Sequence, residues 1–106
     1  MAVSRTPTAV VSGQRRIGEY LATWRRLRSL TAAQVADRAG LSRHTVMRLE
    51  NGEGASVESM LRVARALGVL DSLIEALDPY ATDVGRLRSD QALPQRVRHP
   101  RAERQP

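Results

Sequence analysis

The stretch AAQVADRAGLSRHTVMRLEN, residues 32–51, constrains the fold more than any other part of the sequence. Two short patterns of apolar residues at helical spacing stand on either side of Gly40, a residue that tolerates the left-handed backbone that ends many helices. Leu41 can fill the angle between the two helices, and Ser42 can cap the second one. The predicted inward positions are Val35, Ala36, Ala39, Val46 and Leu49. The sequence therefore predicts a helix, a tight turn and a second helix.

The second of these helices has an outward face that needs a partner. Because Val46 and Leu49 are expected to point inward, the opposite face of the helix carries basic and polar side chains. The residues on that face are Arg43, His44, Met47 and Arg48. A helix face with these basic side chains is expected to bind a polyanion.

The longer stretch LTAAQVADRAGLSRHTVMRLENG resembles the helix-turn-helix of the phage repressor and Cro family, often called the Xre family. The matched positions are Val35, Ala36, Gly40, Leu41, Val46, Leu49, Glu50 and Gly52. The resemblance covers residues 17–78 and implies an all-α, five-helix, lambda-repressor-like DNA-binding domain. It also implies a homodimer that represses transcription from a double-stranded DNA operator. Two positions depart from the family, because Ala32 stands where many relatives have Gln, and Ser29 where Gly is more usual.

The dimensions of DNA select candidate contacts on the second helix. A B-form major groove is about 12 Å wide and accepts one α-helix, so outward side chains near the start of that helix meet base edges. Arg43 and Arg48 match the paired acceptors of guanine, although either could bind phosphate instead. His44 could donate to guanine or to phosphate, and Thr45 could meet a thymine methyl group or bond the backbone of its own helix.

The remaining candidates lie at the ends of the two helices or on the same outward face. Ser42 begins the second helix and could direct its amide or hydroxyl at a phosphate, and the resemblance implies a phosphate contact at Asn51. Met47 could meet thymine methyl groups. Gln34 could reach the DNA backbone, although it does not occupy the position that Gln takes in relatives. The predicted DNA-binding residues are Gln34, Ser42, Arg43, His44, Thr45, Met47, Arg48 and Asn51.

The resemblance further implies a structural ion pair between the first and third helices. In the family the matching Arg folds inward to pair with the Glu that ends the recognition helix, and both residues are present here as Arg25 and Glu50. The alternative is that they are two ordinary surface charges.

Charge is distributed unevenly along the 106 residues, whose net charge is +6. Residues 13–30 hold five Arg and one Glu, residues 53–83 hold two Arg and six acidic residues, and residues 84–106 hold six Arg and two acidic residues. A basic first helix and a basic tail thus flank an acidic segment, which suggests one side that faces a polyanion and one that faces away from it.

Composition argues against several classes of protein. The sequence has no Cys, which excludes disulfides and thiolate zinc sites, and it has no apolar run of the roughly 20 residues that a membrane helix needs. His44 and His99 are far apart, and no paired carboxylates or phosphate-binding Gly loop accompany them. We therefore expect a cytoplasmic protein that is not an enzyme, with no metal and no cofactor.

The flanking segments complete the predicted domain organisation. Residues 1–12 are expected to form a flexible arm, residues 13–78 the DNA-binding domain, and residues 79–106 a basic tail that is mostly flexible or ordered by a partner. In the first helix, Trp24 shares a stripe with Ile17, Leu21 and Leu27 and is expected in the core.

Helices four and five are expected to follow the recognition helix. Ser56 should cap the fourth helix, and Gly68 should end it. The fifth begins near Asp71, and its apolar residues Leu73, Ile74 and Leu77 suggest a dimer surface, with packing into the core as the alternative.

The chain has a second, more restricted resemblance. As a whole, with its tail of the LPQRVR type, it is similar to HipB-like antitoxins, which repress their own operon and bind a HipA-like kinase toxin. Its segment Leu93 to Val97 could add to a sheet edge or wedge between subunits, or the whole tail could be simply disordered. The alternative function is therefore an antitoxin that sequesters a kinase.

Overall fold

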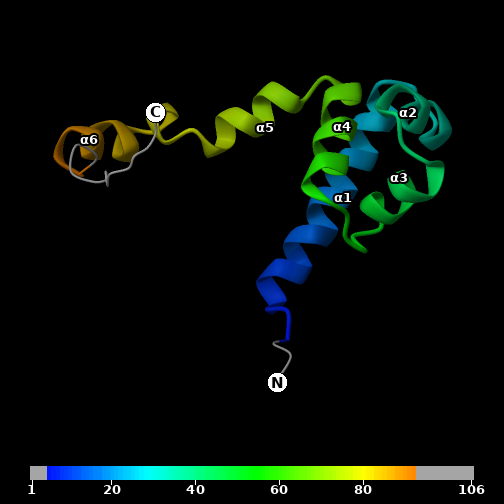
Figure 1. Ribbon diagram of the computed structural model, residues 1–106, viewed down its shortest axis with the longest axis horizontal. Coiled ribbons are helices and arrows are strands. Elements are labelled where there is room, and N and C mark those ends of the chain that lie inside the picture. The colour runs from blue at the N-terminus through cyan, green and yellow to red at the C-terminus, as the bar shows by residue number, and fades with distance from the viewer. Residues whose placement is uncertain (1–4, 93–106) are drawn as a thin grey trace, which may run out of the picture. The chain divides into compact units, whose positions relative to one another are not determined.

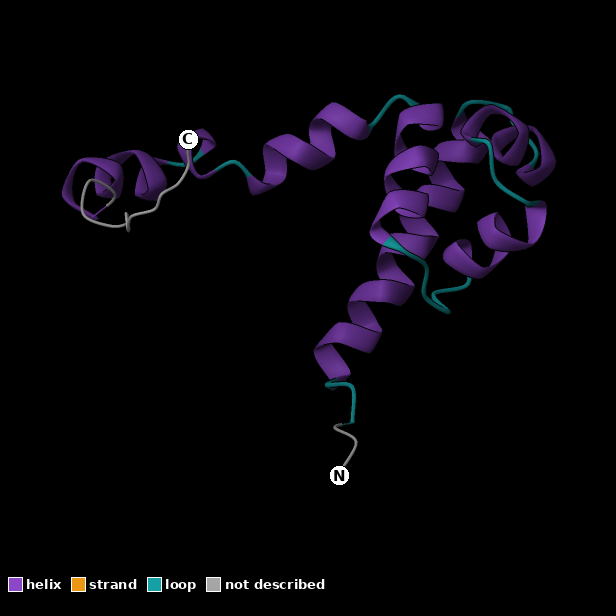
Figure 2. Cartoon of the chain, viewed as in Figure 1, coloured by secondary structure: helices purple, strands orange, loops and turns teal. Residues whose placement is uncertain are grey.

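The computed structural model describes residues 5–92, and within that range the chain is all-helical (Figures 1 and 2). Its elements are α1 (Thr8–Leu27), α2 (Ala32–Ala39), α3 (Arg43–Glu50), α4 (Val57–Leu67), α5 (Leu70–Leu77), the short 3-10 helix η1 (Pro79–Ala81) and α6 (Asp83–Ala92). The predicted all-α fold is confirmed. The chain divides into two compact units, residues 1–71 and residues 72–106, which are described separately.

The first unit is built around a small apolar core to which α1, α2, α3 and α4 all contribute. Its members are short aliphatic side chains, and Val35, Val46, Val63 and Leu67 are almost completely excluded from solvent. α2 packs against both α3 and α4, and α1 packs against α3 and α4. This arrangement holds α3 by its buried residues and leaves its other face to solvent.

Local sequence signals account for the turn between α2 and α3. The Thr31 hydroxyl accepts a hydrogen bond from the Gln34 N–H, while the Gln34 side chain accepts one from the Thr31 N–H. This reciprocal capping box fixes the start of α2. Gly40 then ends the helix in the left-handed region at φ +69°, and Ser42 caps α3. Ser29 also adopts a positive φ, of +57°, which costs an L-residue about 1–2 kcal/mol and explains why Gly is favoured there.

α1 differs from the predicted first helix at its start and in the face that it buries. It begins at Thr8, so residues 8–12 of the predicted flexible arm are helical, and residues 1–4 lie outside the described range. The prediction that Trp24 is a core anchor is wrong, because its side chain remains 40% exposed. The buried residues of α1 are Gly18, Leu21 and Ala22, which turns the Trp24 side of the helix outward.

Gly18 explains this rotation, because it lets α1 approach the end of α3 closely. A Cβ atom at this position would lie 2.5 Å from the carbonyl oxygens of both Leu49 and Glu50. Backbone atoms cannot yield as a flexible side chain can. The face of α1 that contains Gly18 is therefore the face that meets α3.

Gly18→Ala should therefore destabilise the domain, by about 1–3 kcal/mol, the usual cost of overpacking a well-packed interior. The measurement is the free energy of unfolding from urea titration followed by circular dichroism. Gly13→Ala is the matched control, because nothing lies within 4 Å of a Cβ at that position in the same helix. The control should stabilise α1 by up to about 1 kcal/mol, the difference in helix propensity. Equal effects of the two substitutions would contradict a close contact at Gly18.

The second unit consists, in its described part, of α5 from Ser72 onward, followed by η1 and α6. Asp78 caps η1 by accepting a hydrogen bond from the Tyr80 N–H, and η1 packs against α6. α6 is longer than the single weak helical turn expected around Val84 and Leu87, both of which are exposed. Residues 79–92 of the predicted tail are thus described, whereas the segment Leu93 to Val97 and residues 98–106 lie outside the described residues.

Candidate nucleic-acid interface

α3 is amphipathic, with one polar face exposed to solvent and the opposite, apolar face buried in the core. Val46 and Leu49 are buried, whereas Arg43, His44 and Arg48 are exposed. Asn51, the C-cap residue of α3, is exposed as well. Four predicted contact residues therefore share one accessible side of the helix and its end.

Ser42 and Thr45 are coupled to each other at the start of α3. The Ser42 hydroxyl oxygen accepts a hydrogen bond from the Thr45 N–H at 3.1 Å, and the two hydroxyl oxygens lie 2.9 Å apart. Thr45 thus bonds at the cap of its own helix, one of the two roles that its sequence position allowed. The cap satisfies one amide of the first turn and leaves amides at the positive end of the helix for an anion.

Arg48 is engaged with the loop that follows α3. Its guanidinium donates to the Glu53 carbonyl oxygen at 3.3 Å, and it lies 3.9 Å from the Glu53 carboxylate. Both side chains are about half exposed, and such a pair contributes only about 0–1 kcal/mol. A stronger anion could therefore displace Glu53 from Arg48 at little cost.

Met47 and Gln34 are placed differently from the expected DNA contacts. Met47 is half-buried and packs against the core, because the apolar side of α3 is wide enough to include it beside Val46. Gln34 is exposed, but its side-chain oxygen is used in the capping box with Thr31. The structure therefore gives both side chains a structural contact.

Arg25 and Glu50 form a bidentate ion pair between α1 and the end of α3. The Arg25 Nε atom lies 2.7 Å from one Glu50 carboxylate oxygen, and Nη2 lies 3.1 Å from the other. The remaining nitrogen, Nη1, donates to the Leu30 carbonyl oxygen at 3.0 Å. Only 16% of the Arg25 side chain and 8% of the Glu50 side chain are exposed. The hydrogen bonds to Glu50 raise the pKa of Arg25, so this guanidinium is charged at every pH at which the domain can be studied.

Sequence reasoning missed the contact between α1 and the loop after α3. A Cβ atom at Gly52 would lie 2.8 Å from the Arg15 Cα atom, so the first half of α1 lies against the loop that directly follows α3. Arg15 is exposed at this contact, and so is Asn51, which directly precedes Gly52 in the sequence. Only the close approach of two backbones reveals this placement, which adds a cation to the α3 side of the domain.

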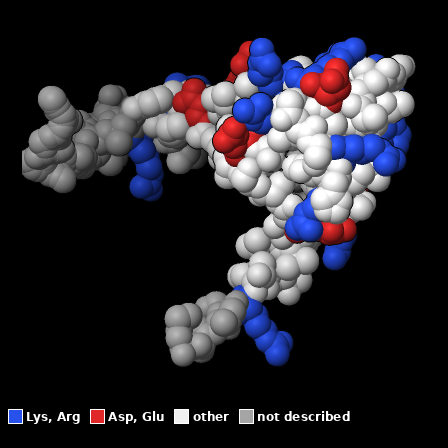
Figure 3. Space-filling view, turned by 45° about the vertical axis from the view of Figure 1, so that its right-hand side comes forward, with Lys and Arg blue, Asp and Glu red and all other residues white. Residues whose placement is uncertain are grey.

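Other arginines serve the scaffold. Arg62 donates to the Ala39 carbonyl oxygen at the end of α2, and Arg28 donates to the Leu67 carbonyl oxygen at the end of α4. Both are helix ends whose carbonyl groups need donors. Figure 3 shows basic side chains spread over the visible face of the domain, with acidic side chains between some of them. The candidate interface is therefore distinguished by where each arginine lies and what it bonds, more than by the total number of cations.

The described residues show no metal site and no membrane-spanning element. Among residues 5–92, no group of three His, Cys, Asp or Glu residues is placed to hold a metal ion. In the same range, no helix has the length and apolar character needed to cross a bilayer.

Comparison with known proteins identifies the family of the chain. The family described as "Helix-turn-helix domain" matches residues 16–77, from the second half of α1 to the end of α5. No curated protein and no solved structure matches the chain. The family match covers more than half of the 106 residues and contains the whole α2–turn–α3 unit with its exposed basic face. The chain therefore belongs to the helix-turn-helix domain family of DNA-binding regulators.

Proposed function

We propose that this protein is a homodimeric, sequence-specific transcriptional repressor that inserts α3 into the major groove of its operator. The observation that carries the proposal is the exposed pair Arg43 and His44 in the first turn of α3, a helix whose opposite side is packed into the core. Val46 and Leu49 anchor α3 in the core, and the Arg25–Glu50 pair ties its last residue to α1. A reading helix must be held rigidly, since base contacts depend on side chains placed within a fraction of an ångström.

In this proposal the start of α3 contacts both bases and phosphates, whereas the end of α3 contacts phosphates. At the start of α3, we expect the exposed Arg43 to form a bidentate contact with guanine and the amides beside Ser42 to receive a phosphate. At the other end of α3, we expect the exposed Arg15 and Asn51 to contact phosphates. Arg48 joins them when DNA phosphate displaces Glu53. Base contacts thus supply sequence preference, and the surrounding groups supply affinity and register.

In the proposed function the protein acts in the cytoplasm. Dimerisation would give it the two-fold symmetry of an operator with two half-sites. α5 leaves apolar side chains uncovered, since Ile74 is 55% exposed and Leu77 is 82% exposed. Two copies joined through such a surface can place their recognition helices about 34 Å apart, one turn of DNA. A HipA-like kinase partner finds no support among the described residues, because the LPQRVR segment that suggested it lies beyond Ala92.

Arg43→Ala should relax the preference for one base pair in each half-site, by about 1–3 kcal/mol of discrimination. The measurement is selection of bound fragments from a randomised DNA library, followed by titration of the selected sites. Arg15→Ala is the control, because a phosphate contact carries no sequence information and its loss should weaken binding to all sequences alike. Even loss of affinity across the library with both variants would show that Arg43 does not read a base.

A further inference from the structure

The loop that follows α3 places an acidic side chain among the groups proposed to contact DNA. Residues 42–55 comprise α3, its cap residues and this loop, and their only acidic residues are Glu50 and Glu53. Glu50 is bound to Arg25. Glu53 is about half exposed and lies beside Arg48 of α3. A negative charge at this place opposes the binding of phosphate, so its effect on DNA binding has to be considered.

Two reciprocal hydrogen bonds join Arg48 to the backbone of Glu53. The Glu53 N–H donates to the Arg48 carbonyl oxygen at 2.9 Å, and the Arg48 Nη2 atom donates to the Glu53 carbonyl oxygen at 3.3 Å. The Arg48 Nη1 atom also lies 3.9 Å from the Glu53 carboxylate. In the free protein the guanidinium of Arg48 is therefore occupied by the loop.

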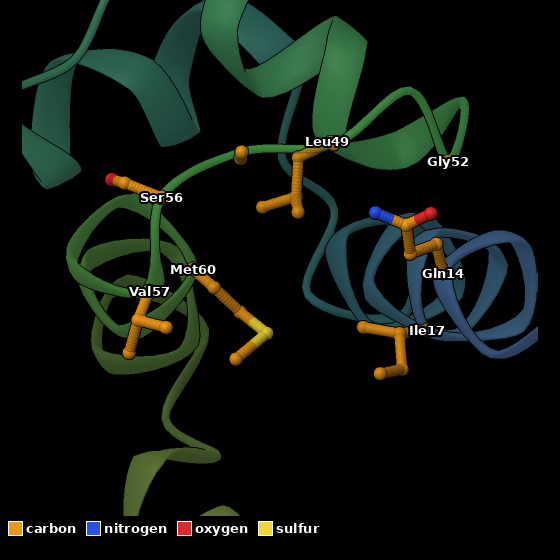
Figure 4. Close-up of a pocket in the computed structure, with 9 residues that line it drawn as sticks. Gln14, Ile17, Leu49, Gly52, Ser56, Val57 and Met60 are labelled. Atoms are coloured by element: carbon orange, nitrogen blue, oxygen red, sulfur yellow. The ribbon is translucent and has the colours of Figure 1, made fainter. Parts of the chain in front are cut away.

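The loop is fixed on both sides of Glu53. Gly52 has a φ of +73°, and a Cβ atom there would lie 2.8 Å from the Arg15 Cα atom, so the start of the loop is held against α1. Figure 4 shows the loop running from Gly52, near Gln14 of α1, to Ser56, which caps α4. Because the backbone is held at both ends, the carboxylate of Glu53 stays within reach of Arg48.

Arg48 can exchange this carboxylate for a DNA phosphate. A guanidinium binds both anions through the same planar arrangement of donors. The pair with Glu53 is exposed and therefore weak, whereas a contact with phosphate also releases a condensed cation from the DNA. Exchange is favourable, but the net gain in binding is reduced by the strength of the pair that must first be broken.

We propose that Glu53 competes with DNA phosphate for Arg48 and thereby lowers the affinity of the protein for DNA of every sequence. This role of Glu53 rests on the proposed docking of α3 on DNA and names a residue that sets the strength of that docking. A phosphate contact carries no sequence information, so the reduction is uniform. It shortens the time spent on each of the about 10⁶–10⁹ competing sites that a genome offers.

Glu53→Gln should raise the affinity for DNA by about 2–5-fold for each bound copy, the factor that corresponds to an exposed ion pair. The substitution removes the charge of the carboxylate but keeps the backbone carbonyl oxygen that Arg48 contacts. The full-length protein is titrated into two fluorescently labelled duplexes, one with the site selected from the library and one of scrambled sequence, and anisotropy gives the affinity. The gain should be equal on both duplexes, largest at about 50 mM salt and smaller as added salt screens the pair.

Two further variants test whether the gain acts through Arg48. Glu58→Gln changes the net charge by the same amount, but Glu58 pairs with Arg62 on α4, so the affinity should change much less. Arg48→Ala alone should weaken binding to both duplexes. In the Arg48→Ala background Glu53→Gln should give no gain, because no guanidinium remains to be released. Equal thermal midpoints by circular dichroism for the wild type and the two Glu→Gln variants exclude an effect through folding.

Four outcomes would overturn the role of Glu53 while leaving the DNA-binding role intact. The first is wild-type binding with no gain from Glu53→Gln. The second is an equal gain from Glu58→Gln, which is an effect of net charge. The third is a gain that persists in the Arg48→Ala background, where Glu53 repels DNA directly. The fourth is a gain confined to the selected site, where Arg48 contacts a base. Binding of the wild type to neither duplex would instead reject the proposed function, and the role of Glu53 with it.

Discussion

Arg25→Ala should lower the free energy of unfolding by about 3 kcal/mol, the lower end of the range for removing one partner of a buried ion pair. The loss is large because Glu50 is 92% covered in the native state and would keep a charge there without its guanidinium. A small domain has a total stability of about 5 kcal/mol, so the variant should be partly unfolded near body temperature. Urea unfolding followed by circular dichroism measures the effect.

The controls separate the geometry of this pair from charge alone. Arg25→Lys keeps the positive charge but loses the planar fork that meets both carboxylate oxygens, so its loss should be intermediate. Glu58→Gln removes the exposed pair with Arg62, in which the side chains are 75% and 48% exposed, and should change stability by less than about 0.5 kcal/mol. Replacing Arg25 and Glu50 together by Met and Leu should recover part of the loss, because no buried charge then lacks a partner. An Arg25→Ala change no larger than the Glu58→Gln change would show that the pair is ordinary surface charge.

The helix-turn-helix unit could be predicted from sequence because its boundaries are set by local chemistry. Thr31 with Gln34, Gly40 and Ser42 each act within one turn of the chain, and the structure ends and starts its helices at these residues. Local hydrogen bonds and backbone preferences do not depend on distant residues. The order of helices followed from the same kind of signal at Ser56 and Gly68.

α1 shows where periodicity is insufficient. The apolar stripe predicted for this helix runs through Ile17, Leu21, Trp24 and Leu27, whereas the buried residues are Gly18, Leu21 and Ala22, so the two faces share only Leu21. Hydrophobicity favours the predicted stripe, yet Ile17 and Trp24 stay exposed because Gly18 lets the backbone of α3 approach the neighbouring face. A pattern gives the spacing of a face, whereas the choice between two faces depends on the shape of the partner.

The sequence predicted which charged side chains of the candidate site are exposed, but it did not predict which neighbours the side chains of the site contact. Arg43 and His44 are exposed simply because Val46 and Leu49 are buried on the opposite side. The contact of Arg48 with Glu53 depends on the path of the loop after α3, and sequence spacing does not define that path. Met47 packs inward because a helix of eight residues needs a wide apolar side to be held.

Binding to the operator should weaken by about 10³–10⁵-fold when salt is raised from about 50 to about 200 mM. This is the largest effect that we expect, and it follows from a dimer that neutralises about 6–10 phosphates and releases their condensed cations. Fluorescence anisotropy of a labelled operator, titrated at a series of salt concentrations, gives the slope of log affinity against log salt. A flat response would reject the proposed docking mode.

The same titration assigns roles to individual arginines, since only phosphate contacts enter the slope. Arg15→Ala should reduce its magnitude by about 1 for each bound copy, because one phosphate contact is lost. Arg43→Ala should lower operator affinity at every salt concentration while leaving the slope unchanged, because a contact with guanine releases no cation. If instead Arg43→Ala lowers the slope and Arg15→Ala does not, then the start of α3 binds the backbone and the bases are read elsewhere.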